Sequence, residues 1–513
     1  MKLINKYITL AFTATMLLPT VACHDLLDEP AENKTFTEET DYAQSGNMIQ
    51  PLIGAYARFY NAGWETYPLI SVRGDDVNAG GLGDQQDYDA TDNFKYNKDY
   101  WMYNSLWQGF YSNVLDAYSA ANQINLYREA GASDQLADQY VAETKTIASF
   151  LLFNLSRVWG DILIPQSYDP TDLLNQELST REEVMRHISS EMAEAAKVLP
   201  DMNPNQRTDI RGGVTKYTAL AIKALADLEL NDYQAVASAT GEIINSGKFV
   251  LESDFYELFK TKGKLNSENL LEWQYSDFGQ GSGDSKSYLW GFFGPQNWTP
   301  KVAGIGGGWG FYEPSFKYIK FMLDRGEVSR LQTSVMFTDR GIAELKKDSK
   351  YAKLPNWISN TTPSGDVVND YARAYFASGK HYMPSDQFTP GRTDYGSNKN
   401  MPCIRYAEIL LMYAEALTNG ASGSGMSADD AVNLVRTRAG LGKLSGVTNQ
   451  QVMDEKFAEL AMEWGTRYYD MVRLGKVDEL SYDGRVFNMN LRFLPYPQNQ
   501  VDQLPALKGD KNE

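Results

Sequence analysis

Cysteine and histidine are scarce in this sequence of 513 residues. The two cysteines, Cys23 and Cys403, are too few for a disulfide scaffold, so an exported chain of this size would have to rely on its hydrophobic core for stability. The three histidines are far apart in the sequence and lack the spacing of a zinc site. We therefore expect neither a bound metal nor another cofactor.

Basic side chains are outnumbered, with 48 lysines and arginines against 66 aspartates and glutamates, which gives a net charge of −18. A body this acidic repels phosphate backbones, so nucleic-acid binding is not expected. An uncharged sugar is one ligand that suits such a surface. Hydrophobic residues make up 43% of the chain, enough for a substantial core. The length allows roughly two to four ordinary domains, or one large helical unit with insertions.

The hydrophobic run near the N-terminus is too short to span a bilayer. It covers Ile8–Leu18, follows two lysines and ends shortly before Cys23. This pattern predicts an export signal over residues 1–22. It leaves two alternatives: an ordinary signal peptide that happens to precede a cysteine, or a lipoprotein signal after which Cys23 becomes the lipidated first residue. We favour the lipoprotein, in which residues 23–45 form an acidic tether.

Helical periodicity is clearest near the C-terminus. In Pro402–Leu417 apolar residues recur at steps of three and four, and Arg405 and Glu408 are spaced to meet on the helix surface. Ser427 starts a capping box for the next helix. A third helix is expected over about Gln450–Trp464. The short loop between the first two predicts an antiparallel hairpin.

The other predicted helices also come in pairs. Residues 214–247 have the length of a tetratricopeptide repeat, with Asn231 and Asp232 at the turn. The stretch Leu251–Met401 has no sustained period and scatters Gly, Ser, Asn and Pro among aromatics, which indicates a loop-rich, ligand-binding part. The predicted fold is therefore mostly α, with about four tetratricopeptide-like helical hairpins in a single unit over residues 46–513. The helical pairs are expected at about 47–127, 138–199, 214–247 and 403–440.

Aromatic residues in polar, glycine-rich stretches are the candidate ligand site. A pyranose ring has an apolar C–H face and a rim of hydroxyls, so an aromatic ring can lie under the face while polar side chains bond the rim. The candidate platforms are Trp64, Tyr96, Trp101, Trp290, Trp298 and Trp309, and the candidate rim residues are Arg73, Asp75, Asp76 and Asn78.

Loop packing is the alternative for these rings, and for Trp101, Trp290 and Trp298 both interpretations stay open. Other tryptophans sit in periodic or strand-like apolar runs and are expected in the core. These are Trp107, Trp159, Trp273 and Trp464.

A glycosidase is the rival interpretation. It needs a carboxylic acid of raised pKa and a second carboxylate about 5–10 Å away. With 66 acidic residues a chance pair is nearly certain, so their presence indicates nothing. Glu408, Glu415, Glu459 and Glu463 lie on predicted helices, where we expect them to bond helix neighbours. The stretch 87–92 only half matches a calcium loop. We therefore predict a binding protein without catalytic residues.

Four segments occur in an order that resembles the C-terminal signature of the SusD/RagB family. They are R-Y-A-E-I-L-L-M-Y-A-E-A-L (405–417), A-V-N-L-V-R-T-R-A-G-L (431–441), E-L-A-M-E-W-G-T-R-Y-Y-D-M-V-R-L-G-K (459–476) and L-P-Y-P (494–497). Further matches at 72–77, 142–165 and 215–226 extend the resemblance over nearly the whole chain. The family usually has E-R-R before E-L-A, where this chain has Glu455-Lys456-Phe457, a departure that affects one local surface contact.

The resemblance implies both a fold and a function. Family members are outer-membrane lipoproteins that capture glycans at the surface of Gram-negative bacteria, and their helical pairs pack against an irregular, loop-rich half with few short strands. By resemblance, this chain is a non-catalytic, lipid-anchored protein facing the cell exterior. It would bind polysaccharide or oligosaccharide and pass it to a TonB-dependent, porin-like (SusC-like) transporter. The alternative is a structural lid of that transporter with little sugar binding. The family pattern around Trp309 favours a structural role for that residue.

Overall fold

The computed structural model describes residues 40–61, 63–80, 85–279, 284–392 and 395–508. The predicted signal segment, Cys23 and most of the predicted tether lie outside these residues. In the described ranges, no helix combines the length and the apolar character needed to cross a membrane.

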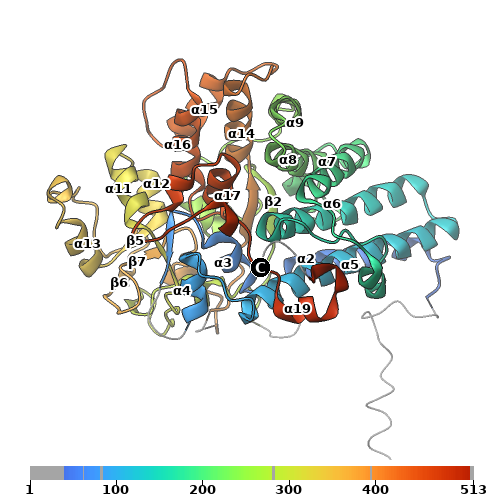
Figure 1. Cartoon of the computed structure of the whole chain (residues 1–513), viewed down its shortest axis with the longest axis horizontal. Helices are drawn as coiled ribbons and strands as arrows, with labels where there is room; N and C mark the ends of the chain where they lie inside the picture. The colour runs from blue at the N-terminus through green and yellow to red at the C-terminus, as the bar shows by residue number, and fades with distance from the viewer. Residues whose placement is uncertain (1–39, 62, 81–84, 280–283, 393–394, 509–513) are drawn as a thin grey trace, which may run out of the picture.

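Long helices form a continuous array over one side and the top of the molecule (Figure 1). Each packs against the next in the series α2, α5, α6, α7, α8, α9 and α14, and α15 and α16 pack against α14. The predicted mostly α fold with tetratricopeptide-like hairpins is confirmed. The bounds are α2 (Ile49–Tyr60), α5 (Trp101–Glu129), α6 (Asp134–Trp159), α7 (Arg181–Val198), α8 (Lys216–Glu229), α9 (Tyr233–Asn245), α14 (Tyr406–Thr418), α15 (Ala428–Arg438) and α16 (Asn449–Leu460).

Capping side chains fix where several of these helices begin. At the start of α7 the Thr180 side chain accepts a hydrogen bond from the Glu183 N–H, and the Glu183 carboxylate accepts one from the Thr180 N–H (2.8 Å). Ser427 and Asp430 form the same capping box at the start of α15, as the sequence predicts. The predicted turn between α8 and α9 is present, with Asn231 at a φ of +55°. These caps satisfy N–H groups that the first helical turn leaves without partners.

The segment around Pro402 is a strand followed by a helix, which corrects the prediction of one helix over Pro402–Leu417. Met401–Arg405 (β8) pairs antiparallel with Asn269–Trp273 (β2), and α14 begins only at Tyr406. Pairing with β2 holds the segment extended and overrides the apolar periodicity.

Helix α16 ends at Leu460, four residues before its predicted end. Met462 and Trp464 have φ values of +64° and +50°, in the left-handed region that a right-handed helix cannot include. The resulting turn places the Trp464 indole 4.8 Å from the Trp273 ring, and the Trp464 Nε1–H donates to the Pro402 carbonyl (2.8 Å).

Short elements and loops make up the other half of the molecule, at the left of Figure 1. The strands of the described residues form two-stranded antiparallel pairs, β1–β4, β2–β8, β3–β6 and β5–β7. This confirms the irregular half with few short strands. The remaining bounds are α3 (Thr66–Ser71), α4 (Gln86–Asp92), α10 (Leu289–Phe293), α11 (Phe316–Asp324), α12 (Ser329–Ser334), α13 (Asp339–Leu345), α17 (Thr466–Arg473), α18 (Val477–Leu480), α19 (Gln498–Gln503), β1 (Val77–Ala79), β3 (Trp298–Thr299), β4 (Tyr312–Pro314), β5 (Val335–Phe337), β6 (Val367–Val368) and β7 (Phe376–Ser378).

One large hydrophobic cluster runs through both halves. It contains the four tryptophans expected in the core, whose exposed fractions are all 4% or less: Trp107, Trp159, Trp273 and Trp464. That prediction is confirmed.

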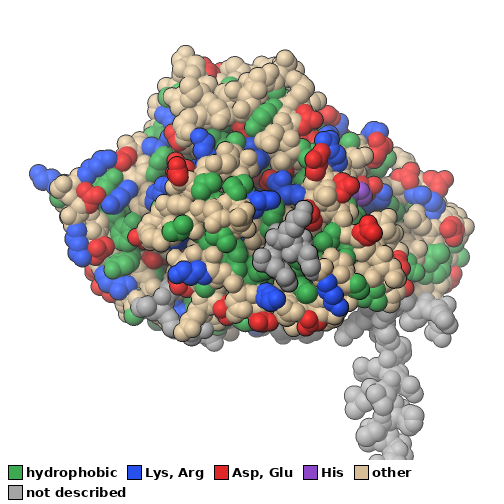
Figure 2. Space-filling view, viewed as in Figure 1, with side chains coloured by type: hydrophobic (Ala, Val, Ile, Leu, Met, Phe, Trp, Pro, Cys, Tyr) green, Lys and Arg blue, Asp and Glu red, His purple; other side chains and the backbone are tan. Residues whose placement is uncertain are grey.

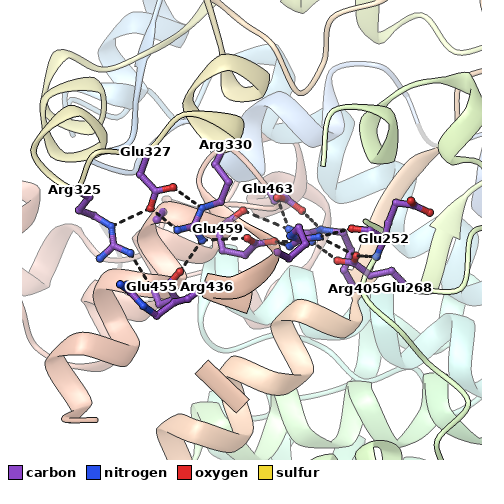
Figure 3. Close-up of polar contacts among 12 residues, drawn as sticks. Glu252, Glu268, Arg325, Glu327, Arg330, Arg405, Arg436, Glu455, Glu459 and Glu463 are labelled. Carbon is purple, nitrogen blue, oxygen red and sulfur yellow. Dashed lines mark hydrogen bonds and ion pairs between the residues drawn. The ribbon is translucent and has the colours of Figure 1, made fainter. Parts of the chain in front are cut away.

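Buried ion pairs connect segments that are distant in the sequence (Figure 3). Arg405, the last residue of β8, pairs with Glu268 (2.6 Å), Glu459 (3.0 Å) and Glu463 (2.7 Å), and all four side chains are buried. This corrects the predicted pairing of Arg405 with Glu408 along one helix. It also corrects the prediction that Glu459 and Glu463 bond helix neighbours. The same correction applies to Glu415, which pairs with Lys456 (3.0 Å) and Arg473 (2.6 Å) of other helices.

The same network ties the loop-rich half to the helical array. Arg330, on α12, pairs with Glu455 (2.7 Å) and Glu459 (3.2 Å) of α16. Arg438, on α15, pairs with Glu459 and with Glu268 (3.1 Å). Because every charge here is buried next to opposite charges, the network is a fixed part of the structure.

Candidate functional site

Three of the tryptophans predicted as ligand platforms lie next to one another. Trp64, which precedes α3, and Trp101, the first residue of α5, have ring centroids 6.1 Å apart, and Trp64 lies 5.2 Å from Trp309. Tyr395 continues the series: its ring is 5.3 Å from that of Trp309, whose Nε1–H donates to the Tyr395 hydroxyl (2.9 Å). We call Trp64, Trp101, Trp309 and Tyr395 the aromatic row.

The aromatic row is both accessible and rigid. Trp101 is 47% exposed, and the other three rings are half-buried. The buried Phe292 ring lies 5.6 Å from Trp64 and supports it. Neighbouring rings of the row meet at interplanar angles of 61°, 82° and 73°, the edge-to-face geometry that aromatic pairs prefer. The row therefore presents apolar ring surface in a fixed arrangement.

Two glycines allow the row to form. A Cβ on Gly308 would lie 2.5 Å from the Gly294 Cα, so only glycine permits this close approach of two backbones. The Trp309 N–H donates to the Gly291 carbonyl (2.6 Å), which holds the segment against α10. A Cβ on Gly291 would lie 3.2 Å from Tyr395 Cγ and 3.5 Å from Trp309 Cζ2. The glycine-rich stretch therefore fixes the position of the Trp309 ring within the aromatic row, which is a structural role for this segment.

Polar side chains follow the exposed end of the row. Asn104 and Gln108 come three and seven residues after Trp101 on α5, which places them on the same helix face. The Asn104 Nδ2 donates to the Gln108 Oε1 (3.0 Å). Next to Trp64, the Glu65 carboxylate accepts a hydrogen bond from the Ser105 hydroxyl. Amides, hydroxyls and a carboxylate are the groups that a hydroxyl-rich ligand needs as partners.

Trp290 and Trp298 are buried, which corrects the prediction that they are ligand platforms. Their exposed fractions are 2% and 9%, and their rings lie 4.9 Å apart in a second hydrophobic cluster. The Trp290 Nε1–H donates to the Gly306 carbonyl (3.2 Å), and the Trp298 Nε1–H to the Ile305 carbonyl (3.3 Å). Backbone carbonyls of the segment that leads to Trp309 thus accept the hydrogen bonds of both indole N–H groups, and both rings pack in the hydrophobic cluster.

The predicted rim residues Asp75 and Asp76 are buried as well, in contacts with the C-terminal part of the chain. Asp75 receives two hydrogen bonds from Arg467 (2.6 and 2.8 Å) and pairs with Lys317 (2.7 Å). Burial opposes ionisation of Asp75, but Arg467 and Lys317 outweigh it and hold its pKa below the usual value. Asp76 accepts a hydrogen bond from the Met462 N–H (2.6 Å), and burial raises its pKa to about 6.

The other predicted residues of this group also bind protein atoms. The Arg73 guanidinium is buried over the Tyr468 ring, 4.4 Å from its centroid. Asn78 is half-buried, and its Oδ1 accepts from Arg485 (2.7 Å). The Tyr96 hydroxyl donates to a backbone carbonyl of the C-terminal loop (2.7 Å). The stretch around residues 73–78 therefore joins the N-terminal and C-terminal parts of the chain, and its polar side chains bind protein atoms.

Comparison with known proteins identifies the family. Residues 255–512 match the profile of the SusD family, and residues 30–225 match a second profile described as starch-binding, associating with the outer membrane. The chain belongs to the SusD family.

Relatives of this SusD-family chain are similar over most of their length. A SusD-like protein of Bacteroides ovatus is 23% identical, in an alignment that covers 91% of this chain and 82% of the relative. SusD-like protein P2 of Formosa agariphila is 24% identical, with coverages of 90% and 89%.

Solved structures share the fold. Surface glycan-binding protein A from Bacteroides thetaiotaomicron, in complex with laminarihexaose, has a TM-score of 0.72 at 22% identity, covering 91% of this chain and 99% of that one. A laminarin-binding SusD-like protein has a TM-score of 0.73 at 22% identity, with coverages of 90% and 97%.

The carboxyl groups of this SusD-family protein whose pKa is raised to about 7, in the range of a general acid, are buried. Burial raises the pKa of Asp92, Glu272, Glu313 and Glu408 to about 7, and their exposed fractions are 8% or less. A bound substrate cannot reach side chains that are covered in this way. In the part of the chain that the structure describes, no group of three or more His, Cys, Asp or Glu side chains is arranged to hold a metal ion.

Proposed function

We propose that this protein is a non-catalytic glycan-binding lipoprotein on the outer face of the outer membrane, which captures polysaccharide or oligosaccharide and passes it to a TonB-dependent, porin-like transporter. The observation that supports this most is the aromatic row, because it joins exposed ring surface to polar side chains. Membership of the SusD family, a family profile described as starch-binding and relatives named for glycan or laminarin binding support it further.

The chemistry of the row suits a neutral sugar. The exposed Trp101 ring offers a flat surface for the C–H face of a pyranose, and Asn104 and Gln108 stand within two helical turns of it to bond hydroxyls. Acidic and basic side chains are interspersed over the face of the molecule in Figure 2, where no large area of one sign is visible among the described residues. This face does not concentrate an ionic ligand.

The affinity of such a site is modest. A stacked ring contributes about 1 kcal/mol beyond its buried area. Two or three rings and a few exposed hydrogen bonds give about −4 to −7 kcal/mol in total, which corresponds to Kd values from about 1 mM to about 10 μM. Binding of this strength serves capture and release along a polymer, where avidity raises the effective affinity.

A panel of polysaccharides in native affinity gels tests the binding. We expect retention by at least one neutral polysaccharide and no release of new reducing ends on prolonged incubation. Production of reducing ends would contradict the non-catalytic function. A folded protein that no polysaccharide retains would favour the structural lid instead.

The lipid anchor is tested separately. Replacing Cys23 with alanine removes the predicted lipidation site, so the variant should leave the membrane fraction when expressed in its natural host. Serine at position 22 in place of Ala22 is a matched control that keeps the cysteine and should stay anchored. A Cys23→Ala variant that remains in the membrane fraction would contradict the anchor.

A further inference from the structure

A groove of about 620 Å³ lies beside α5, beyond the aromatic row. One wall is α5 itself, and the other is the segment 168–174, which overlaps the 3-10 helix η2 (Pro170–Asn175). Helix α19, which lies beside α5 in Figure 1, adds Gln500 and Gln503 to the lining. None of the sequence predictions used this groove.

The floor of the groove is rigid and apolar. The Tyr111 hydroxyl donates to the Leu163 carbonyl (2.9 Å) and accepts from the Leu163 N–H (3.0 Å), which fixes the floor to α5. The buried Trp107 ring packs edge to face on Trp159, with centroids 5.1 Å apart. A ligand in the groove would therefore meet a preformed surface and lose little affinity to reorganisation.

The walls carry the side chains that a sugar needs. Tyr168 is 48% exposed at the rim, and its turn is held by hydrogen bonds from the Asp169 N–H to the Ser167 Oγ (3.0 Å) and from the Thr171 N–H to the Asp169 Oδ1 (2.9 Å). Its ring is thus an accessible platform on a fixed turn. Neutral amides and hydroxyls supply the possible hydrogen bonds to a ligand, from Gln108, Ser112, Ser119 and Gln503.

The charge of the lining indicates which class of glycan fits. Asp116 is the one charged side chain among the described residues that line the groove, and it pairs with Arg58 (3.6 Å). A sulfated or uronic acid-rich glycan would find no cation in this lining. The missing cation does not weaken the binding of a neutral glycan, because its hydroxyls need only neutral hydrogen-bond donors and acceptors.

The groove and the aromatic row share one face of α5. On α5, the groove residues that follow Trp101 by 7, 11 and 18 positions are Gln108, Ser112 and Ser119. At 3.6 residues per turn, each of these spacings is a whole number of helical turns to within about 20°. At a rise of 1.5 Å per residue, Gln108 lies about 10 Å along the helix from Trp101. Asn104 lies between Trp101 and Gln108 in the sequence of α5. Its Nδ2 donates to Gln108 (3.0 Å), and its Oδ1 accepts from the Gln500 Nε2 (2.8 Å).

We propose that this groove is a second binding site for a neutral glycan, in which a chain that rests on the aromatic row continues along α5 toward Tyr168. The inference rests on the proposed function and adds to it a second site and a class of ligand. Two weak sites on one polymer bind more tightly than either site alone, since the second contact is intramolecular.

Tyr168 variants test the groove. We expect Tyr168→Ala to weaken binding of the neutral polysaccharide found in the gel panel by about fivefold, or about 1 kcal/mol, in isothermal titration calorimetry. Tyr168→Phe keeps the ring and should bind within twofold of the wild type. Leu136→Ala, at an exposed position on α6 away from the groove, is the control for surface changes. Because Tyr168 is exposed, its variants should keep the wild-type circular dichroism and urea midpoint.

The outcomes separate the groove from the proposed function. If Trp101→Ala loses affinity and Tyr168→Ala does not, the second site is refuted while the aromatic row stands. If Tyr168→Ala instead weakens association with a transporter, the groove is a protein-docking surface and the proposal is wrong. If a sulfated or uronic acid-rich polymer depends on Tyr168 more than a neutral one does, the ligand class is wrong. If no polysaccharide binds the wild type, both proposals fail.

Discussion

Replacing Arg405 with alanine tests how the two halves are held together. Its guanidinium has three carboxylate partners, Glu268, Glu459 and Glu463, and its side chain is 1% exposed. Removing one partner of a buried ion pair costs about 3–5 kcal/mol, because the remaining charge loses its compensation. Arg438 still pairs with Glu268 and Glu459, so we expect the lower end of that range, about 3 kcal/mol.

A surface pair provides the control for this variant. Arg186 and Glu182 lie 2.8 Å apart on α7 with both side chains 66% exposed. Exposed pairs within one helix contribute about 0.3–0.5 kcal/mol, so Arg186→Ala should change the free energy of unfolding by about that much.

Urea denaturation measures both effects. Native domains are stable by about 5–15 kcal/mol, so a loss of about 3 kcal/mol should move the Arg405→Ala midpoint clearly below that of the wild type. The slope of the transition should stay the same if the unfolded state is unchanged. A midpoint for Arg405→Ala that falls no further than that of Arg186→Ala would refute the structural role of the network. The hydrophobic core alone would then hold the halves together.

Other variants and conditions test the corrected features of the site and the core. Trp290→Ala should cost about 3–5 kcal/mol of stability, because it opens a cavity in a buried cluster. Trp101→Ala, at a 47% exposed position, should cost less than about 1 kcal/mol. Equal urea midpoints for the two variants would contradict the assigned burial. Gly308→Ala should lower both stability and glycan retention, since its Cβ would meet the Gly294 backbone at 2.5 Å; unchanged retention would show that the segment tolerates the shift. Burial opposes ionisation of Glu459 and Glu463, but the surrounding arginines and Lys380 hold both pKa values below the ordinary 4.5. Their contribution to stability is therefore complete above pH 4.5 and is lost as the pH falls below it, which urea midpoints between pH 3 and 6 would show as a decline; a flat profile would contradict it.

Features with a local cause were predicted well from the sequence. The capping box of Thr180 and Glu183 and the turn at Asn231 depend on residues within a few positions of one another. The error around Pro402 has the opposite cause. Its strand partner, Asn269–Trp273, is more than 120 residues away, and no periodicity in the segment itself indicates that pairing.

The candidate site was predictable only in part, for the same reason. Trp101 and Trp290 both stand in stretches that look exposed, and their difference depends on which loop covers the ring. The carboxylate of Asp75 looked free because its partner Arg467 lies almost 400 residues later. The residues around Tyr395 in the sequence contain no pattern that would place it in the site. The spacing of Asn104 and Gln108 from Trp101 does place them on one helix face with it, but the prediction did not use that spacing.

The affinity of Trp101→Ala for the retained polysaccharide tests the central claim most directly. Calorimetry should show affinity about five- to tenfold below that of the wild type, as expected for the loss of a stacked ring and its buried area. Trp101→Phe should recover most of the difference, because a smaller ring still offers an apolar face. Wild-type affinity in Trp101→Ala, with the protein folded and the polysaccharide bound, would show that sugar does not rest on the aromatic row.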